Sequence, residues 1–154
     1  MLKNNFILDY LLNLWKNNLL MITVKCTVEA PIEQVWNLWT TPEHIMKRNN
    51  ASDDWHTSYA ENDLRVGGRF KSTMASKDGT MSFDFEGEYT KVENYSMIEY
   101  KLADNRKIDI YFVGLEDGVQ IIESFDPETQ NPEEMQRGGW QAILDNFKRY
   151  VENN

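Results

Sequence analysis

The stretch from residue 135 to residue 151, MQRGGWQAILDNFKRYV, decides how this chain folds. Its large apolar residues recur every three or four positions and form one stripe along a helix. The stripe consists of Trp140, Ile143, Leu144, Phe147 and Val151. The residues between them are mostly polar, so the pattern predicts a long amphipathic helix with one buried face. No other segment after residue 21 predicts a helix of this length, and we expect the preceding strands to wrap around it.

The two ends of this helix carry different signals. Asn131 before Pro132 predicts an N-cap followed by a proline at the first helical position. Gly138 and Gly139 lie inside the helix, where each costs about 1 kcal/mol relative to alanine. The glycine pair therefore predicts either a kink or the close approach of another backbone.

The part of the chain before this helix alternates between apolar and polar residues, which is typical of half-buried strands. The predicted strands cover residues 22–29, 55–59, 69–76, 81–89, 98–102, 108–112 and 119–125. Tight-turn signals such as Asp78-Gly79 and Asp117-Gly118 separate several of them and predict an antiparallel meander. Two short helices, residues 31–39 and 41–47, follow the first strand. The fold class is therefore α+β.

A sheet with one apolar face must cover that face, and the C-terminal helix is the obvious cover. A strongly curved sheet that grips a single helix often leaves an internal cavity between the two. We therefore expect a cavity beneath residues 135–151.

Length and charge narrow the classes of function. A chain of 154 residues suits one domain, which we place at residues 21–154. The net charge is −9, which opposes binding to nucleic acid and to anionic membranes. The single cysteine, Cys26, excludes an intramolecular disulfide and suits a cytoplasmic protein. Its parity with Ile22 and Val24 predicts a small buried side chain rather than a reactive thiol.

Residues 1–20 differ from the rest and predict an N-terminal extension. Phe6, Tyr10 and Leu14 have helical spacing, so an amphipathic helix is expected. The apolar run is too short to span a membrane and is interrupted by Asp9 and Asn13. Our hypothesis is that this extension lies outside the conserved domain. An exposed apolar helix also suggests a homodimer formed through it.

No pattern for a metal or a cofactor is present, so we predict neither. His44 and His56 are the only histidines and have no paired cysteines, and Gly67-Gly68 lacks the lysine of a phosphate-binding loop. The most informative charge is Glu123, whose parity with Ile121 and Phe125 predicts a position on the apolar face. It is either a ligand anchor or general base, or a paired or rim-exposed carboxylate near a strand end.

Four segments, in this order, resemble a known superfamily. They are VEAPIEQVWNLWTTPE at residues 28–43, DLRVGGRF at residues 63–70, FEGEY at residues 85–89, and Gly139-Trp140. Together they resemble the SRPBCC superfamily, and within it the branch similar to the C-terminal domain of the activator of the heat-shock protein 90 ATPase. The resemblance covers residues 22–151. Relatives often carry an aromatic residue where this chain has Lys47, Arg48 and Asn49.

The resemblance implies a START-like helix-grip fold: one strand, two short helices, six further strands and a long helix, with a curved antiparallel sheet of about seven strands around that helix. Relatives use the cavity for lipids and other apolar small molecules. The residues predicted to line the cavity are Trp39, Trp55, Phe70, Phe83, Phe85, Tyr100, Ile110, Phe112, Ile121, Glu123, Trp140, Leu144 and Phe147.

Three functional hypotheses follow. The leading one is a non-catalytic cytoplasmic protein that binds a hydrophobic small molecule. The second is an enzyme of cyclase or hydrolase type that uses Glu123, His56 and a tyrosine in one pocket. The third, which rests on the resemblance alone, is a partner of the chaperone.

Overall fold

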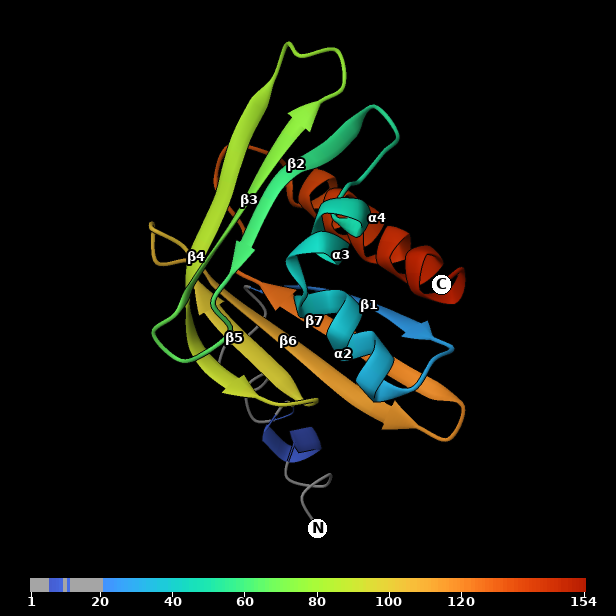
Figure 1. Cartoon of the computed structure of the whole chain (residues 1–154). Helices are drawn as coiled ribbons and strands as arrows, with labels where there is room; N and C mark the ends of the chain where they lie inside the picture. The colour runs from blue at the N-terminus through green and yellow to red at the C-terminus, as the bar shows by residue number, and fades with distance from the viewer. Residues whose placement is uncertain (1–5, 10, 12–20) are drawn as a thin grey trace.

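The computed structural model describes residues 6–9, 11 and 21–154, and its domain is a sheet that curls around one long helix (Figure 1). The elements follow one another as β1 (Ile22–Val28), α2 (Ile32–Thr40), α3 (Pro42–Arg48), β2 (Trp55–Asn62), β3 (Arg69–Ser76), β4 (Ser82–Glu93), β5 (Met97–Lys101), β6 (Lys107–Leu115), β7 (Gly118–Phe125) and α4 (Glu133–Glu152). This order is the predicted strand, two short helices, six strands and a long helix.

The seven strands form one antiparallel sheet in the order β1-β7-β6-β5-β4-β3-β2. Strands β2 to β7 pair as the predicted meander, and β1 joins at the free edge of β7. Register shifts in β2 between Thr57 and Tyr59, and in β4 between Tyr89 and Lys91, mark bulges. Bulges bend strands and increase their twist, which favours the curved sheet that grips the helix.

Helix α4 packs its apolar stripe into the concave face of this sheet, as the spacing predicts. Leu144, Phe147 and Val151 are all nearly inaccessible to solvent. Trp140 stacks on Phe125 of β7, with 4.1 Å between ring centroids and 13° between ring planes. Helix α2 lies over the same sheet and contributes Trp36 to this core. The α+β helix-grip prediction is confirmed.

The predicted start of α4 is wrong. Pro132, not Asn131, occupies the N-cap position, because its carbonyl accepts the first helical hydrogen bond, from the Gln136 N–H. The Asn131 amide instead donates to the Glu128 carboxylate at 2.9 Å. The Gln136 side chain then ties down the preceding loop, since its amide nitrogen donates to the carbonyls of Glu128 and Asn131.

Of the two alternatives predicted for the glycine pair of α4, a kink or the close approach of another backbone, the close approach is wrong. The helix is continuous through both positions. A Cβ atom added to Gly138 or to Gly139 would meet no atom within 4 Å. The glycines therefore leave space open rather than admit a neighbouring strand.

The turn at residues 63–68 requires glycine at two positions. Gly67 has a φ of +83°, and a Cβ on Gly68 would lie 2.1 Å from the Asp63 carbonyl oxygen. The N–H of Gly67 donates to the Tyr89 carbonyl, and the Tyr89 N–H donates to the Gly68 carbonyl, both at 2.9 Å. This turn is therefore fastened to the middle of β4.

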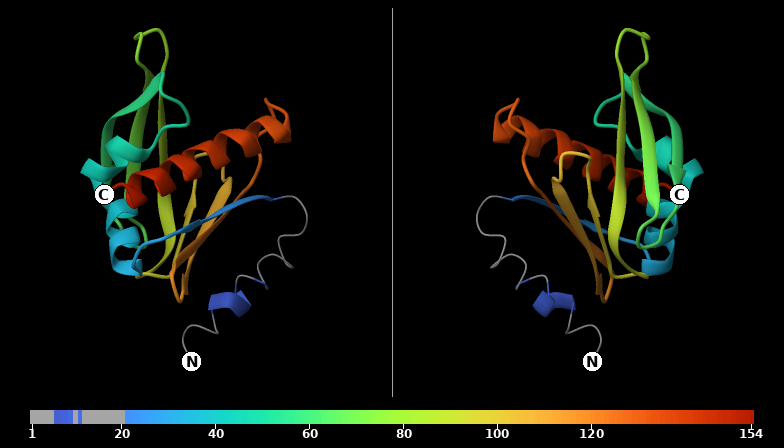
Figure 2. Two further views of the ribbon diagram at one scale, coloured as in Figure 1. Left: turned by 90° about the vertical axis from the view of Figure 1, so that its right-hand side faces the viewer. Right: turned by 90° about the vertical axis from the view of Figure 1, so that its left-hand side faces the viewer.

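The convex face of the sheet carries a second, smaller apolar cluster. It consists of the buried residues Met97, Tyr111 and Ile122, against which Phe6 packs. Residues 6–9 and 11 are helical and lie on the opposite side of the sheet from α2 and α3 (Figure 2). The predicted helix also includes Tyr10 and Leu14, which lie outside the described residues.

A chain that begins at Met21 is expected to fold, because β1, which starts at Ile22, and α4 supply the core without the extension. Loss of the Phe6 contact is expected to lower the free energy of unfolding by about 1 kcal/mol, the scale of partly burying one aromatic side chain. Urea unfolding measures the difference, and Phe6→Ala in the full chain is the control, with a similar loss. A truncated chain without cooperative unfolding would contradict the prediction.

Candidate functional site

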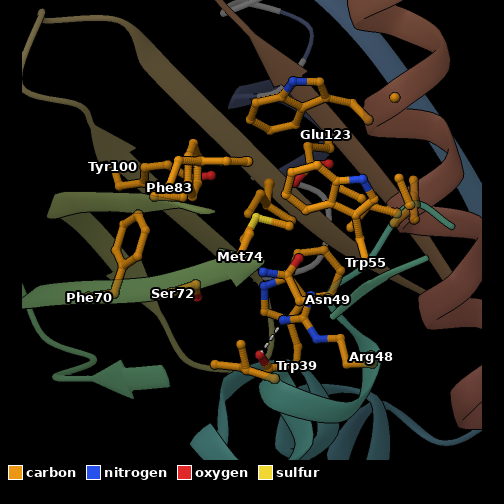
Figure 3. A pocket seen from close by; sticks show the side chains of 18 of the residues that line it. Trp39, Arg48, Asn49, Trp55, Phe70, Ser72, Met74, Phe83, Tyr100 and Glu123 are labelled. Carbon is orange, nitrogen blue, oxygen red and sulfur yellow. Dashed lines mark hydrogen bonds between the residues drawn. The ribbon is translucent and has the colours of Figure 1, made fainter. Parts of the chain in front are cut away.

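A cavity of about 490 Å³ lies between the sheet, α3 and the N-terminal half of α4 (Figure 3). Most of the residues predicted to line a cavity do line it. They are Trp39, Trp55, Phe70, Phe83, Phe85, Tyr100, Ile110, Glu123, Trp140 and Leu144. The structure therefore has a cavity beneath the helix, where the curved sheet was expected to leave one. Ligand binding by these residues stays a prediction.

Phe112, Ile121 and Phe147 were predicted at the same place, but they do not line the cavity. They belong to the solid core beside it. Trp39, which does line the cavity, packs edge-on against two of them, with 5.5 Å to Phe112 and 4.8 Å to Phe147 between ring centroids. These residues support the cavity wall from behind.

Phe70, Phe85, Tyr89 and Tyr100 form an aromatic wall of the cavity, and Phe70 contacts the other three rings. Its ring packs edge-on against Tyr100, with 4.6 Å between centroids, and lies 5.3 Å from the Tyr89 ring. A Cβ on Gly87, the residue opposite Phe70 on β4, would come within 2.9 Å of the ring. The missing side chain at Gly87 therefore lets Phe70 lie flat against the neighbouring strand.

Glu123 is a carboxylate buried on this apolar wall. Its neighbours across the sheet are Val24 and Ile110, and only 6% of its surface is exposed. Within the described part of the chain it forms no hydrogen bond and no ion pair. Burial raises the pKa of Glu123 to about 7, while the positive charge of Arg48 acts in the opposite direction. The predicted position on the apolar face is confirmed, and the alternative of a paired or rim-exposed carboxylate is wrong.

Arg48 follows directly after the second short helix that the sequence predicts at residues 41–47. In the structure it is buried at the end of α3 and lines the same cavity. Its Nη2 donates to the Trp39 carbonyl at 2.6 Å, and its guanidinium carbon lies 4.4 Å from the centroid of the Trp39 ring. The Asn146 amide of α4 donates to the Arg48 carbonyl at 2.8 Å and fixes the backbone. The Nε of Arg48 is buried without a hydrogen-bond partner. Burial lowers the pKa of Arg48 to about 10, so the group remains charged at neutral pH.

Two tyrosines on adjacent strands face the cavity in different states. The Tyr89 hydroxyl donates to Asn62, whose amide donates in turn to the Thr40 carbonyl at 2.8 Å. The Tyr100 hydroxyl forms no hydrogen bond among residues that the structure describes. Burial, and next the charge of Glu123, raise the pKa of Tyr100 well above its ordinary value. Tyr100 therefore stays protonated and can donate a hydrogen bond.

The predicted acid–base group of Glu123, His56 and a tyrosine does not come together in one pocket. His56 is exposed and does not line the cavity that holds Glu123 and Tyr100. His44 lies elsewhere and shares a 2.7 Å hydrogen bond with the Tyr150 hydroxyl. Cys26 is half-buried, and burial raises the pKa of its thiol to about 12. In the described ranges no group of three His, Cys, Asp or Glu side chains could hold a metal ion.

Several cavity residues were missed at the sequence level. Ser72 and Met74 line the cavity from β3 and share the parity of Phe70, so the alternation contained the signal for them. Gly139 also lines it, from α4. Arg48 and Asn49 had no such signal, because a charged and a polar residue after a short helix are typical of an exposed loop.

The fold and its cavity define the class: the chain is a helix-grip protein of the SRPBCC type. Residues 29–152 match the family described as "Activator of Hsp90 ATPase homolog 1-like protein". The chain belongs to this family. No match was found among curated proteins.

Solved structures from bacteria agree with this assignment. The AHSA1-like protein of Aeromonas hydrophila is 44% identical, with a TM-score of 0.82, over 86% of this chain and 92% of that one. Chr148 of Cytophaga hutchinsonii is 55% identical, with a TM-score of 0.75 and the same coverage. Protein NE0264 of Nitrosomonas europaea is 20% identical, covers 87% of this chain and 95% of its own, and shares the fold with a TM-score of 0.76.

Replacement of Glu123 by Gln is expected to stabilise the protein at pH 8. A carboxyl whose pKa is higher in the folded chain keeps its proton more tightly there, so its ionisation destabilises the fold as the pH rises from about 4.5 to about 7. Each unit of pKa difference corresponds to about 1.4 kcal/mol, so the gain at pH 8 is on the order of 3 kcal/mol. At pH 4.5 most of the gain should disappear.

Urea unfolding of both proteins at the two pH values measures this effect. The pKa of Asp109 is also raised to about 7, by burial, so only the difference between the variant and the parent isolates Glu123. Glu86→Gln, at an exposed position of β4, is the matched control and should change little. A Glu123→Gln variant that is less stable at pH 8 would show that the carboxylate has a structural partner.

Proposed function

We propose that this protein binds an apolar small molecule in the cavity between the sheet and α4. The observation that carries the proposal is the cavity of about 490 Å³ with its aromatic wall. Small-molecule sites are typically concave, largely apolar and roughly 300–1,000 Å³ in volume, with a few polar groups that fix orientation. The position of Glu123, Arg48 and Tyr100 beside the aromatic side chains of the lining supports the same function.

The rim of the cavity supports a route for an apolar molecule. Phe83 of β4 and Met135 of α4 both line the cavity, and 51% and 62% of their surfaces are exposed. Trp55 of β2 packs against Phe83 with 5.9 Å between ring centroids. Apolar surface thus continues from the interior to the outside.

The other hypotheses stay predictions with less support. The chaperone hypothesis rests on the family name, and the homodimer rests on the residue pattern of the extension. An enzyme would need a second acid–base group beside Glu123, and His56 does not supply it. Cytoplasmic location is a proposal supported by the single cysteine. Of the helices in the described ranges, none has the length and apolar character needed to cross a membrane.

The two glycines of α4 provide a matched test of binding. Gly139 lines the cavity and is half-buried, whereas the adjacent Gly138 is exposed and does not line it. Neither position has an atom within 4 Å of an added Cβ, and leucine favours a helix more than glycine does by roughly 0.8 kcal/mol. Gly139→Leu is therefore expected to fold normally, to fill part of the cavity and to weaken binding at least about tenfold.

Binding is measured by titration with a panel of apolar probes that includes naphthalene, followed by the amide resonances of the cavity residues. Gly138→Leu should bind the probes as the parent does. If no probe binds the parent, or if both leucine variants bind equally well, the proposed function is wrong.

A further inference from the structure

Two polar groups that line the cavity, the Glu123 carboxylate on β7 and the Tyr100 hydroxyl on β5, lack hydrogen-bond partners within the described part of the chain. A third, the Arg48 guanidinium on α3, also lines the cavity, and of its nitrogens only Nη2 forms a hydrogen bond among the described residues. All three side chains are more than nine-tenths buried. Buried polar groups are nearly always hydrogen-bonded, because an unpaired group loses its hydration without compensation. Three such groups from three separate elements around one cavity point to a polar group on the ligand.

We propose that the ligand of this cavity is an apolar molecule that carries one uncharged polar group, a hydroxyl or an amide, which binds between Glu123, Tyr100 and Arg48. The inference rests on the proposed function and specifies the chemical class of the ligand. In this proposal the apolar body lies against the aromatic side chains around Phe70, and the polar group lies beside Glu123 of β7; Figure 3 labels both side chains.

The hydrogen-bonding capacity of the three side chains selects this class. An ionised carboxylate only accepts hydrogen bonds, whereas an arginine side chain only donates them. Tyr100 is protonated and available as a donor. A ligand hydroxyl can donate to Glu123 and accept from Tyr100 at the same time, and an amide can do the same through its N–H and its carbonyl. A purely apolar ligand would leave these groups unpaired.

The charges of the cavity exclude charged ligand groups at the same position. Glu123 and, near the rim, Glu61 would repel an anion, and the net charge of −9 adds to this. A cation would meet Arg48, whose guanidinium is held in place by the Trp39 carbonyl and by the faces of Trp39 and Phe147. No ion pair within 4.0 Å joins Arg48 to Glu123 in the described structure, so each retains its field in the cavity. An uncharged group interacts with both fields without adding a buried charge.

Four naphthalene probes test the proposal, because they share one apolar body and differ in a single substituent. They are naphthalene, 2-naphthol, 2-naphthoate and 2-naphthylmethylammonium, titrated at pH 8. We expect 2-naphthol to bind about tenfold more tightly than naphthalene, the scale of one hydrogen bond to a charged group. The carboxylate and the ammonium probe should bind more weakly than naphthalene.

Two variants identify the groups that carry this preference. Glu123→Met removes the acceptor at nearly the same volume and should bring 2-naphthol and naphthalene to within about twofold of each other, while naphthalene itself binds as before. Tyr100→Phe removes only the hydroxyl and should reduce the preference in part. Glu86→Met, at an exposed position of β4, is the matched control and should preserve it.

The outcomes separate the two proposals. If naphthalene and 2-naphthol bind equally, or if a charged probe binds best, the cavity binds apolar molecules but the inferred ligand class is wrong. A preference for 2-naphthol that survives Glu123→Met would also overturn the inference. If none of the four probes binds, the proposed function fails together with the inference.

Discussion

One helix cannot cover the whole concave face of a seven-stranded curved sheet, and the rest of this structure follows from that constraint. An α-helix with its side chains is only about 10–12 Å wide, whereas strands are spaced about 4.8 Å apart. The C-terminal half of α4 fills its share of the face with Leu144, Phe147 and Val151, and Trp36 of α2 adds to the same core. The N-terminal half presents Gly139 instead of a large side chain, so the space between it and β2–β4 remains open. The core therefore lies beneath the C-terminal half of α4, and the cavity lies beneath its N-terminal half.

The sequence predicted this fold because apolar residues recur regularly in it, every second residue in the strands and every three or four residues in the C-terminal helix. Side chains along a strand alternate between the two faces of the sheet, and this alternation predicted that Glu123 lies on the apolar face. The helical period likewise identified the buried stripe of α4. The prediction of where α4 begins failed for a local reason. Asn131 has the right chemistry for a cap, but its side-chain amide donates a hydrogen bond to the Glu128 carboxylate in the preceding loop.

The division between cavity and core lies beyond such patterns. Phe112 and Ile121 have the correct alternation and Phe147 has the correct helical spacing, yet all three lie in the core, where the Trp39 ring packs against Phe112 and Phe147. Alternation predicts the face of the sheet on which a strand residue lies, but it does not predict where along the strand the helix packs. Arg48 is the converse case, a cavity residue that no local pattern predicts. Its surroundings include Trp39, Asn146 and Phe147, of which two lie about a hundred residues away in the sequence, so its local sequence does not indicate that it is buried.

The cost of the buried charges gives the cavity its chemical character. Burial raises the pKa of the unpartnered Glu123 carboxyl to about 7, and the Arg48 guanidinium, although it is held against Trp39, leaves its Nε unpaired. A methionine or a leucine at position 123 would pack against Val24 and Ile110 without this penalty. Inside the cavity the same penalty becomes selectivity, because a ligand group that pairs with Glu123 recovers energy that an apolar or charged competitor cannot. The aromatic wall can then determine how tightly a ligand body is held, while Glu123, Tyr100 and Arg48 determine which substituent it carries.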